Sequence, residues 1–304
     1  MNVIETSLLA KRYRDDWALR ECTLAIPAGH VVALVGPNGA GKTTLLHLAV
    51  GLLTPTSGTM SVLGDLAPGS YEALERIAFV AQDAPLYRQL SVQAMVEVTT
   101  CLNQRFDVPL VKRRLDELGI RDGHKVGKLS GGQQAQLALA LALGRHPELL
   151  VLDEPLARLD PLARHDFMAL VLSTVADEGV SVIFSSHVVS ELERVADYLI
   201  LLAHGQLQMA GDIEELLGEH ALFSGPADDL ERIKEQLNIV HSQVAGRHAQ
   251  LLVRTQIGTA PPNGWERKDV ALEELVLDYL REPLAVSLPG PSGVVAVDDG
   301  KASR

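Results

Sequence analysis

The chain has 304 residues, of which 39 are acidic and 27 are basic, so that its formal net charge is −12. Apolar residues make up 47% of it, which excludes general disorder, and the acidic balance argues against a dedicated nucleic-acid binder, because such proteins present a basic face. This length suits one large domain or two smaller ones, since single cores stop growing near about 250–300 residues.

The first part of the chain alternates between strand and helix patterns. Residues 30–35 form a short β-branched apolar run, which is typical of a strand buried on both faces of a parallel sheet. Leucines at helical spacing predict a helix over Lys42–Leu53, and turn-forming residues at 54–58 end it. Further strands are predicted at 77–81, 149–152 and 180–184, and a helix at 161–178. This alternation predicts an α/β domain with a largely parallel sheet.

Two segments of the first domain differ from this rhythm. Residues 83–130 contain periodic apolar positions without a convincing strand, and we interpret them as a mostly helical insertion. A hairpin is predicted over 198–210 and a short helix over 213–217. We place the first domain at residues 1–220.

Residues 221–283 are predicted to form a small accessory domain of mixed α and β structure. Strands are expected at 237–240 and 250–255, followed by an amphipathic helix at 272–280. The apolar face of that helix packs either on its own chain or on a partner chain; it carries Leu272, Leu275, Val276, Tyr279 and Leu280. Residues 284–304 are rich in Gly, Pro, Ser and Asp and are predicted to be a disordered tail.

The turn between the first buried strand and its helix carries a phosphate-binding pattern. Residues 36–43 read GPNGAGKT, which fits G-x-x-x-x-G-K-[ST]. Glycines let successive backbone N–H groups surround phosphates, and the helix directs its positive end at them. Lys42 is expected to reach the β- and γ-phosphates and Thr43 to ligate Mg²⁺. The candidate nucleotide-binding residues here are Gly36, Asn38, Gly39, Gly41, Lys42, Thr43 and Thr44.

Two carboxylates follow the apolar strand at 149–152. Asp153 is expected to hold Mg²⁺, and Glu154 is placed to orient or deprotonate an attacking water. Acidic pairs also occur after strands as solvated loop residues, so this motif gains weight from the phosphate loop. Between the two motifs lies LSGGQ at Leu129–Gln133, which by itself is a flexible helix cap or an anion-binding nest.

From about Ile4 to His220, the order of these motifs resembles the ATP-binding subunits of ABC transporters. The resemblance also rests on Tyr13 upstream of the phosphate loop, on Gln82 at a strand end and on His187 after the strand at 180–184. It includes the Leu159–Asp160 pair after the acidic motif.

The resemblance implies a role for each of these residues. Tyr13 stacks on adenine, with Trp17 as a competing candidate, while Gln82 senses Mg²⁺ and water. His187 contacts the γ-phosphate, so the expected catalytic set is Glu154, His187 and Gln82. The expected metal ligands are Thr43, Gln82 and Asp153. A second group of expected nucleotide-binding residues comprises Ser130, Gly131, Gly132, Gln133 and Asp160, of which the serine and the glycines address a nucleotide held by a second chain.

The family also implies the architecture and the partners. The expected fold is a P-loop ATPase core with a largely parallel sheet, an antiparallel β subdomain and a helical insertion, followed by the small C-terminal α+β domain. Two chains sandwich two ATP molecules head to tail, as a homodimer or with a second ATP-binding subunit. Membrane permease subunits are the expected partners, and no direct contact with nucleic acid is expected.

The sequence around His187 is most similar to the exporter branch called ABC-2 type, which implies export. This similarity rests on Ser185-Ser186-His187 followed by Glu191, Glu193, Asp197 and Gly205. Three positions depart from the family pattern. Relatives commonly carry arginine where this chain has Gln136 and Leu141, and Arg158 stands where smaller residues are usual. Arg158 either contacts the partner chain or is solvated.

Two other functions fit the sequence less well. A soluble ATPase of this type acting on DNA would insert long coiled coils, but residues 44–128 show no sustained heptads, and ribosome-acting relatives carry two nucleotide domains. A non-hydrolysing regulatory subunit is disfavoured by the intact Glu154 and His187.

The charged residues 1–16 carry no export signal, no apolar run reaches the 18–20 residues of a membrane span, and the two cysteines form no disulfide framework. The expected location is the cytoplasmic face of the membrane, through a permease.

Overall fold

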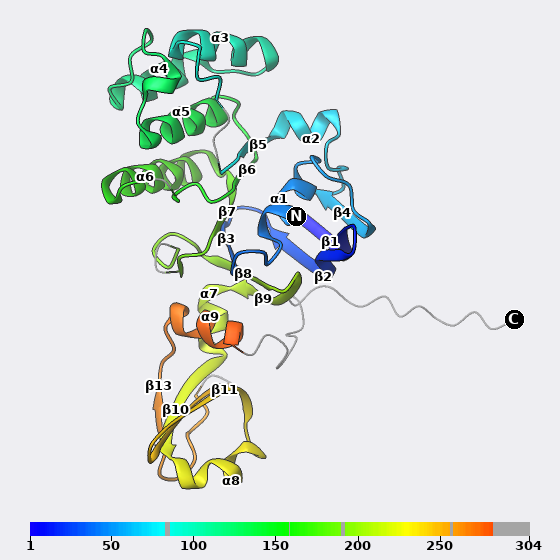
Figure 1. The fold of residues 1–304 in the computed structure, drawn as a ribbon, viewed down its shortest axis with the longest axis vertical. Helices are drawn as coiled ribbons and strands as arrows, with labels where there is room; N and C mark the ends of the chain where they lie inside the picture. The colour runs from blue at the N-terminus through cyan, green and yellow to red at the C-terminus, as the bar shows by residue number, and fades with distance from the viewer. Residues whose placement is uncertain (83–85, 158, 190–191, 256–257, 282–304) are drawn as a thin grey trace, which may run out of the picture.

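The computed structural model describes residues 1–82, 86–157, 159–189, 192–255 and 258–281. The predicted tail at 284–304 lies outside the described residues, as do Arg158 and Glu191. Within these ranges the strands form three sheets, which are spread along the molecule with helices at one end and a small sheet at the other (Figure 1). No helix in the described ranges is both long and apolar enough to cross a membrane.

A six-stranded sheet forms the centre, in the order β5-β6-β7-β3-β8-β9. Five of its strands are parallel, and β9 returns antiparallel to β8. Every residue of β3, β6, β7 and β8 is buried, and for β3 this confirms the predicted strand covered on both faces. The strands span Val31–Val35 (β3), Ile77–Val80 (β5), Leu149–Leu152 (β6), Ser181–Ser186 (β7), Tyr198–Ala203 (β8) and Gln206–Asp212 (β9).

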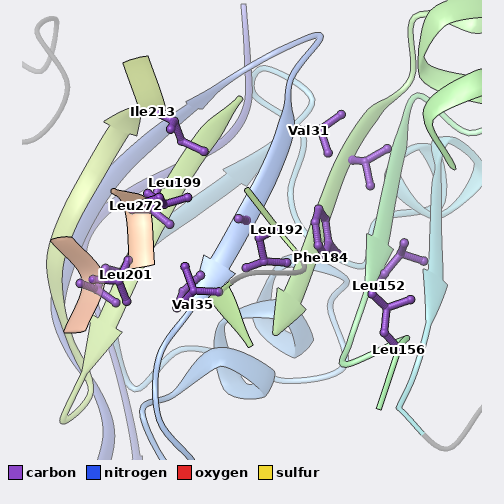
Figure 2. Close-up of a cluster of buried hydrophobic side chains, with 14 of the residues drawn as sticks. Val31, Val35, Leu152, Leu156, Phe184, Leu192, Leu199, Leu201, Ile213 and Leu272 are labelled. Atoms are coloured by element: carbon purple, nitrogen blue, oxygen red, sulfur yellow. The ribbon is translucent and has the colours of Figure 1, made fainter. Parts of the chain in front are cut away.

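Successive residues of these strands enter different cores, because side chains alternate across a sheet. Val32 and Leu34 pack with the antiparallel sheet of order β2-β1-β4 and with helix α1. Val31 and Val35 face the opposite core, where Figure 2 shows them with Leu152 and Phe184. The elements of the first face span Asn2–Tyr13 (β1), Asp16–Pro27 (β2), Lys42–Ala49 (α1), Ser57–Val62 (β4) and Tyr71–Arg76 (α2). Helix α1 ends earlier than predicted, because Gly51 adopts a left-handed backbone with φ of 75°.

The predicted insertion is helical in its described part, where the only strand-like pairing is an isolated bridge between Ser91 and Lys125. Its apolar side chains, among them Val96 and Leu115, form a separate cluster together with Leu137 of the helix that follows the insertion. The helices of this region are α3 (Val92–Leu102), α4 (Val108–Glu117), the 3-10 turn at Val126–Lys128 and α5 (Gly131–Leu143). Helix α6 (Pro161–Glu178) has the predicted limits, and α7 spans Ile213–Gly218.

The C-terminal part forms a four-stranded antiparallel sheet of order β11-β12-β10-β13. The small sheet has a hydrophobic cluster of its own, which includes Phe223, Leu251 and Trp265. The predicted boundary near residue 220 falls at the first residue of β10, and neither β10 nor β13 was predicted. The elements are β10 (His220–Pro226), the 3-10 turn Ala227–Asp229, α8 (Leu230–Lys234), β11 (Asn238–Ala245), β12 (His248–Arg254) and β13 (Glu266–Lys268).

Helix α9 (Leu272–Arg281) packs on its own chain, between the central sheet and the small sheet (Figure 1). Leu272 is fully buried beside Leu199 and Leu201 of β8 (Figure 2), and the same cluster contains Leu222 and Leu252 of the small sheet. The other buried residues of the helix include Leu275, Val276 and Tyr279. Of the two alternatives for this face, the structure therefore has the contact within one chain.

Candidate nucleotide site

The phosphate loop joins β3 to α1, and its glycines stand where a side chain would collide with backbone. A Cβ on Gly41 would lie 2.5 Å from the carbonyl oxygen of Ala18, and the residue has φ of 104°. A Cβ on Gly36 would lie 2.2 Å from the carbonyl oxygen of Leu202. The loop therefore requires glycine at both positions, which agrees with the predicted pattern.

Lys42, the first residue of α1, is buried under the loop that precedes it. Its Nζ donates to the carbonyl oxygens of Gly36 at 2.7 Å and Pro37 at 3.3 Å. It also lies 3.4 Å from Oε1 of Glu154. The ammonium group is thus held at the centre of the loop by acceptors on two sides.

Asp153 lies directly after β6 and is 2% exposed. Two hydroxyl groups donate to its Oδ1: Thr43 at 3.2 Å and Ser185 at 2.7 Å. The contact with Ser185 follows from strand register, since Leu152 of β6 pairs with Phe184 of β7 and the next residues are neighbours.

Glu154 adopts a left-handed backbone, with φ of 47°, although it is not glycine. Its N–H donates to Oγ of Ser185 at 2.8 Å, and the residue is 8% exposed. One carboxylate oxygen faces Lys42, and the other lies 2.8 Å from Nδ1 of His187. Because a carboxylate only accepts, we assign the proton of this bond to Nδ1 of His187.

Lys42, Thr43, Glu154 and His187 border one cavity of about 360 Å³. Gly36 and Asp153 are not among its lining residues, but each is bonded to one that is. Gln82, which is exposed, stands at the rim beside the part of the chain that the structure leaves undescribed. The lining residues are Ala18, Asn38, Gly39, Ala40, Gly41, Lys42, Thr43, Thr44, Gln82, Glu154 and His187.

The predicted residues Ser130–Gln133 lie at the start of α5, and Asp160 lies at the start of α6. None of them lines this cavity. Ser130 caps α5 in a capping box: its Oγ accepts from the N–H of Gln133, whose side chain accepts from the N–H of Ser130. Asp160 caps α6 by accepting from the N–H groups of Leu162 and Ala163. Gly131 and Gly132 follow Ser130 in the first turn of α5.

Tyr13 stands at the turn of the β1–β2 hairpin, 45% exposed, with the ammonium of Lys11 5.4 Å from its ring centre. Trp17, on the other strand of the hairpin, is under the guanidinium of Arg12. Neither aromatic residue lines the cavity.

Sequence reasoning missed two contributors to the site. Ser185 bonds both acidic residues, and the available signal was the Ser185-Ser186 pair that ends β7 just before His187. Ala18 borders the cavity, and its carbonyl oxygen lies beside Gly41 of the phosphate loop. Because this contribution comes from the backbone, no residue type in the sequence indicates it.

Comparison with known proteins gives consistent matches. The family model described as ABC transporter matches residues 19–157. An uncharacterized ABC transporter ATP-binding protein of Nostoc is 33% identical, covering 79% of this chain and 76% of that protein. The lantibiotic transport ATP-binding protein SrtF of Streptococcus pyogenes is 32% identical, covering 71% and 96%. The structure of cbiO1 from Clostridium perfringens, part of the ABC transporter complex cbiONQ, is 26% identical with a TM-score of 0.62, covering 78% and 96%.

Proposed function

Since the chain belongs to the family of ABC transporter ATP-binding proteins, we propose that it powers export through separate permease chains by closing and opening a dimer around two ATP molecules. It is an ATPase that binds ATP as a subunit of a transporter. Export is supported by the similarity to a lantibiotic transport protein and by the ABC-2-like residues around His187. We propose that it acts at the cytoplasmic face of the membrane.

The observation that carries this proposal is the carboxylate of Glu154, which faces both Lys42 and His187 in one cavity. A bound phosphate offers Lys42 a stronger acceptor than the backbone carbonyls that it now contacts. Release of Lys42 leaves Glu154 free to orient a water molecule or take its proton. His187 donates to the far oxygen of Glu154 through Nδ1, and a second proton, on Nε2, would let it donate to the γ-phosphate.

Gln82 and the adenine contact complete the roles proposed within one chain. Gln82 stands at the cavity rim, where it can meet both a metal-bound water and a partner protein. Tyr13 is proposed to stack on adenine, because the same hairpin brings Ala18 to the cavity.

The donor set fits Mg²⁺. Thr43 lines the cavity and its hydroxyl lies 3.2 Å from Oδ1 of the buried Asp153, while Gln82 adds an amide oxygen at the rim. Mg²⁺ takes oxygen ligands, and it is usually bound through one or two carboxylates and the substrate phosphates instead of a closed protein cage. These three residues would hold the ion, which would neutralise charge on the phosphates.

The capped starts of α5 and α6 support the proposed dimer. Ser130 and Asp160 are both exposed, and the first turns that they cap lie outside the cavity of their own chain. A helix start binds anions, because its N–H groups and dipole favour negative charge. We propose that these turns contact the γ-phosphate in the cavity of a second chain, either an identical copy or another ATP-binding subunit.

An apolar hollow beside the site is the proposed contact for the permease. Its volume is about 450 Å³, and it is lined in part by Leu52, Phe79, Met95 and Leu141. Leu141 replaces the arginine common in relatives and makes the hollow more apolar. A neighbouring hollow of about 620 Å³ is bordered by the exposed Tyr71, Leu74 and Leu102. Exposed apolar side chains gathered in one place mark an interaction surface.

We also propose that residues 221–283 form an accessory domain attached to the ATPase domain of residues 1–220. The buried face of α9 supports this attachment.

The ATPase proposal is tested by steady-state hydrolysis with the purified chain. Glu154→Gln preserves the shape of the side chain but removes the base, and we expect kcat to fall by roughly 10²–10⁴-fold. Binding of ATP should persist, since Lys42 loses its buried ion-pair partner and keeps its phosphate. Unchanged turnover in this variant would show that Glu154 is not the catalytic carboxylate.

The partner proposal is tested by purifying tagged Glu154→Gln protein from detergent-solubilised native membranes with ATP, followed by mass spectrometry. We expect a stoichiometric chain with several membrane spans. Leu52→Glu or Leu102→Glu, at the two hollows, should release it, whereas Val244→Glu, at a similarly exposed apolar residue of the small sheet, should not. Ribosomal proteins or DNA in place of a membrane chain would contradict the transporter proposal.

A further inference from the structure

We propose that Ser185 is a positioning residue for ATP hydrolysis, because its one hydroxyl group joins the metal-binding carboxylate to the backbone of the catalytic carboxylate. This inference rests on the proposed roles of Asp153 and Glu154. Ser185 is not itself a lining residue of the nucleotide cavity, and its hydroxyl contacts Asp153 and Glu154, so that its effect on the reaction passes through these two residues.

The direction of both hydrogen bonds is fixed by chemistry. The N–H of Glu154 can only donate, so that Oγ of Ser185 accepts at 2.8 Å. The single hydroxyl proton is then available for Asp153, whose Oδ1 accepts at 2.7 Å. Ser185 thus fixes which oxygen of the Asp153 carboxylate faces β7.

The bond to Glu154 acts on a strained residue. A left-handed backbone is sparsely populated by residues other than glycine and persists only where the surroundings hold it. In this turn the N–H of Glu154 is held by Ser185, while the side chain is held by Lys42 and His187. Loss of the hydroxyl would free one of these anchors and let the carboxylate turn away.

Ser185 is 0% exposed, and β7 lies between β6 and β3 in the central sheet, so that its hydroxyl is shielded from bulk solvent. Truncation would leave the N–H of Glu154 buried without its acceptor, and would leave Thr43 as the remaining hydroxyl donor to Oδ1 of Asp153. The chain of contacts from Thr43 through Asp153 and Ser185 to Glu154 would then be broken at its middle. We therefore expect a loss in the chemical step with little effect on ATP binding.

The test compares kcat, KM and ATP affinity for Ser185→Ala, Ser185→Val and Ser185→Thr in the full chain. Valine and threonine have the same shape and differ in the hydroxyl group, so that their ratio isolates the two hydrogen bonds. We expect kcat to fall by about 10–100-fold in the alanine and valine variants, with KM and ATP affinity within about threefold. Threonine should restore at least a third of the wild-type kcat.

Ser181→Ala is the matched control, because Ser181 lies in the same strand and its Oγ also accepts from a backbone N–H, that of Gly29 at 2.9 Å. It should retain kcat within about twofold. Equal kcat values for the valine and threonine variants, or wild-type kcat for Ser185→Ala, would overturn the inference. If Glu154→Gln also turned over ATP normally, the proposed function itself would fail, so that the two failures are distinguishable. If the valine variant does not fold, the alanine and threonine variants decide.

Discussion

Replacement of Leu272 by alanine tests whether α9 fastens the small sheet to the ATPase core. The side chain is fully buried, and the residues around it belong both to β8 of the central sheet and to β10 and β12 of the small sheet. Leucine-to-alanine changes in cores cost about 2.7–5.0 kcal/mol, and the cost is highest where the walls of the new cavity do not collapse. Because two sheets hold these walls, we expect a loss of about 4 kcal/mol in the free energy of unfolding.

The assay is urea unfolding of the full chain, followed by circular dichroism. Leu277→Ala is the matched control on the same helix: Leu277 is 43% exposed, and its truncation should cost under about 1 kcal/mol. In a Trp17→Phe background, Trp265 reports the small sheet alone. Its transition should coincide with that of the whole chain. A loss below about 1.5 kcal/mol for Leu272→Ala, or equal losses in the two variants, would refute the reasoning.

Two further predictions concern the small sheet. Gly225→Ala places a Cβ 2.3 Å from the ring of Trp265 and should lower the free energy of unfolding by about 1–3 kcal/mol, measured by thermal unfolding. Gly123→Ala is the control, because a Cβ there has no atom within 4 Å and should leave stability unchanged. Equal effects of the two substitutions would contradict this packing argument. Burial lowers the pKa of His220 below its ordinary 6.5, so the folded protein binds fewer protons there than the unfolded chain. Its contribution to stability is complete above about pH 6.5 and is lost as the pH falls toward the folded pKa. His220→Gln should flatten this part of the curve of unfolding free energy against pH, and an unchanged slope would show that other groups cause it.

Much of the fold could be predicted because its signals are local. The strand at Leu149–Leu152 and the helix at Pro161–Glu178 have the predicted limits, since an unbroken apolar run defines one and Asp160 with Pro161 starts the other. The strands β10 and β13 were missed for the opposite reason. β13 consists of Glu266, Arg267 and Lys268 and exists through its pairing with β10, a contact between distant segments that no local pattern records.

The site divides in the same way. Lys42, Thr43 and Glu154 were predicted from motifs whose spacing encodes the loop and the strand end. Ser185 was not assigned, because its contacts depend on the register between β6 and β7, which is set by the whole sheet. The roles of Ser130 and Asp160 remain predictions, since the atoms that they are expected to contact belong to another chain.

The double attachment of the small sheet has a mechanical meaning. Only Glu219 separates α7 from β10, and the chain returns through α9 to the central sheet, where the hydroxyl of Tyr279 lies 2.8 Å from Nε2 of His220. A domain joined to its neighbour through a single linker can rotate about that linker, whereas a domain attached at two points moves together with its neighbour. We therefore expect the small sheet, which extends away from the ATPase core (Figure 1), to turn with the core as one stiff unit, so that small rotations of the core would become larger displacements at its far hairpin, around Gly246.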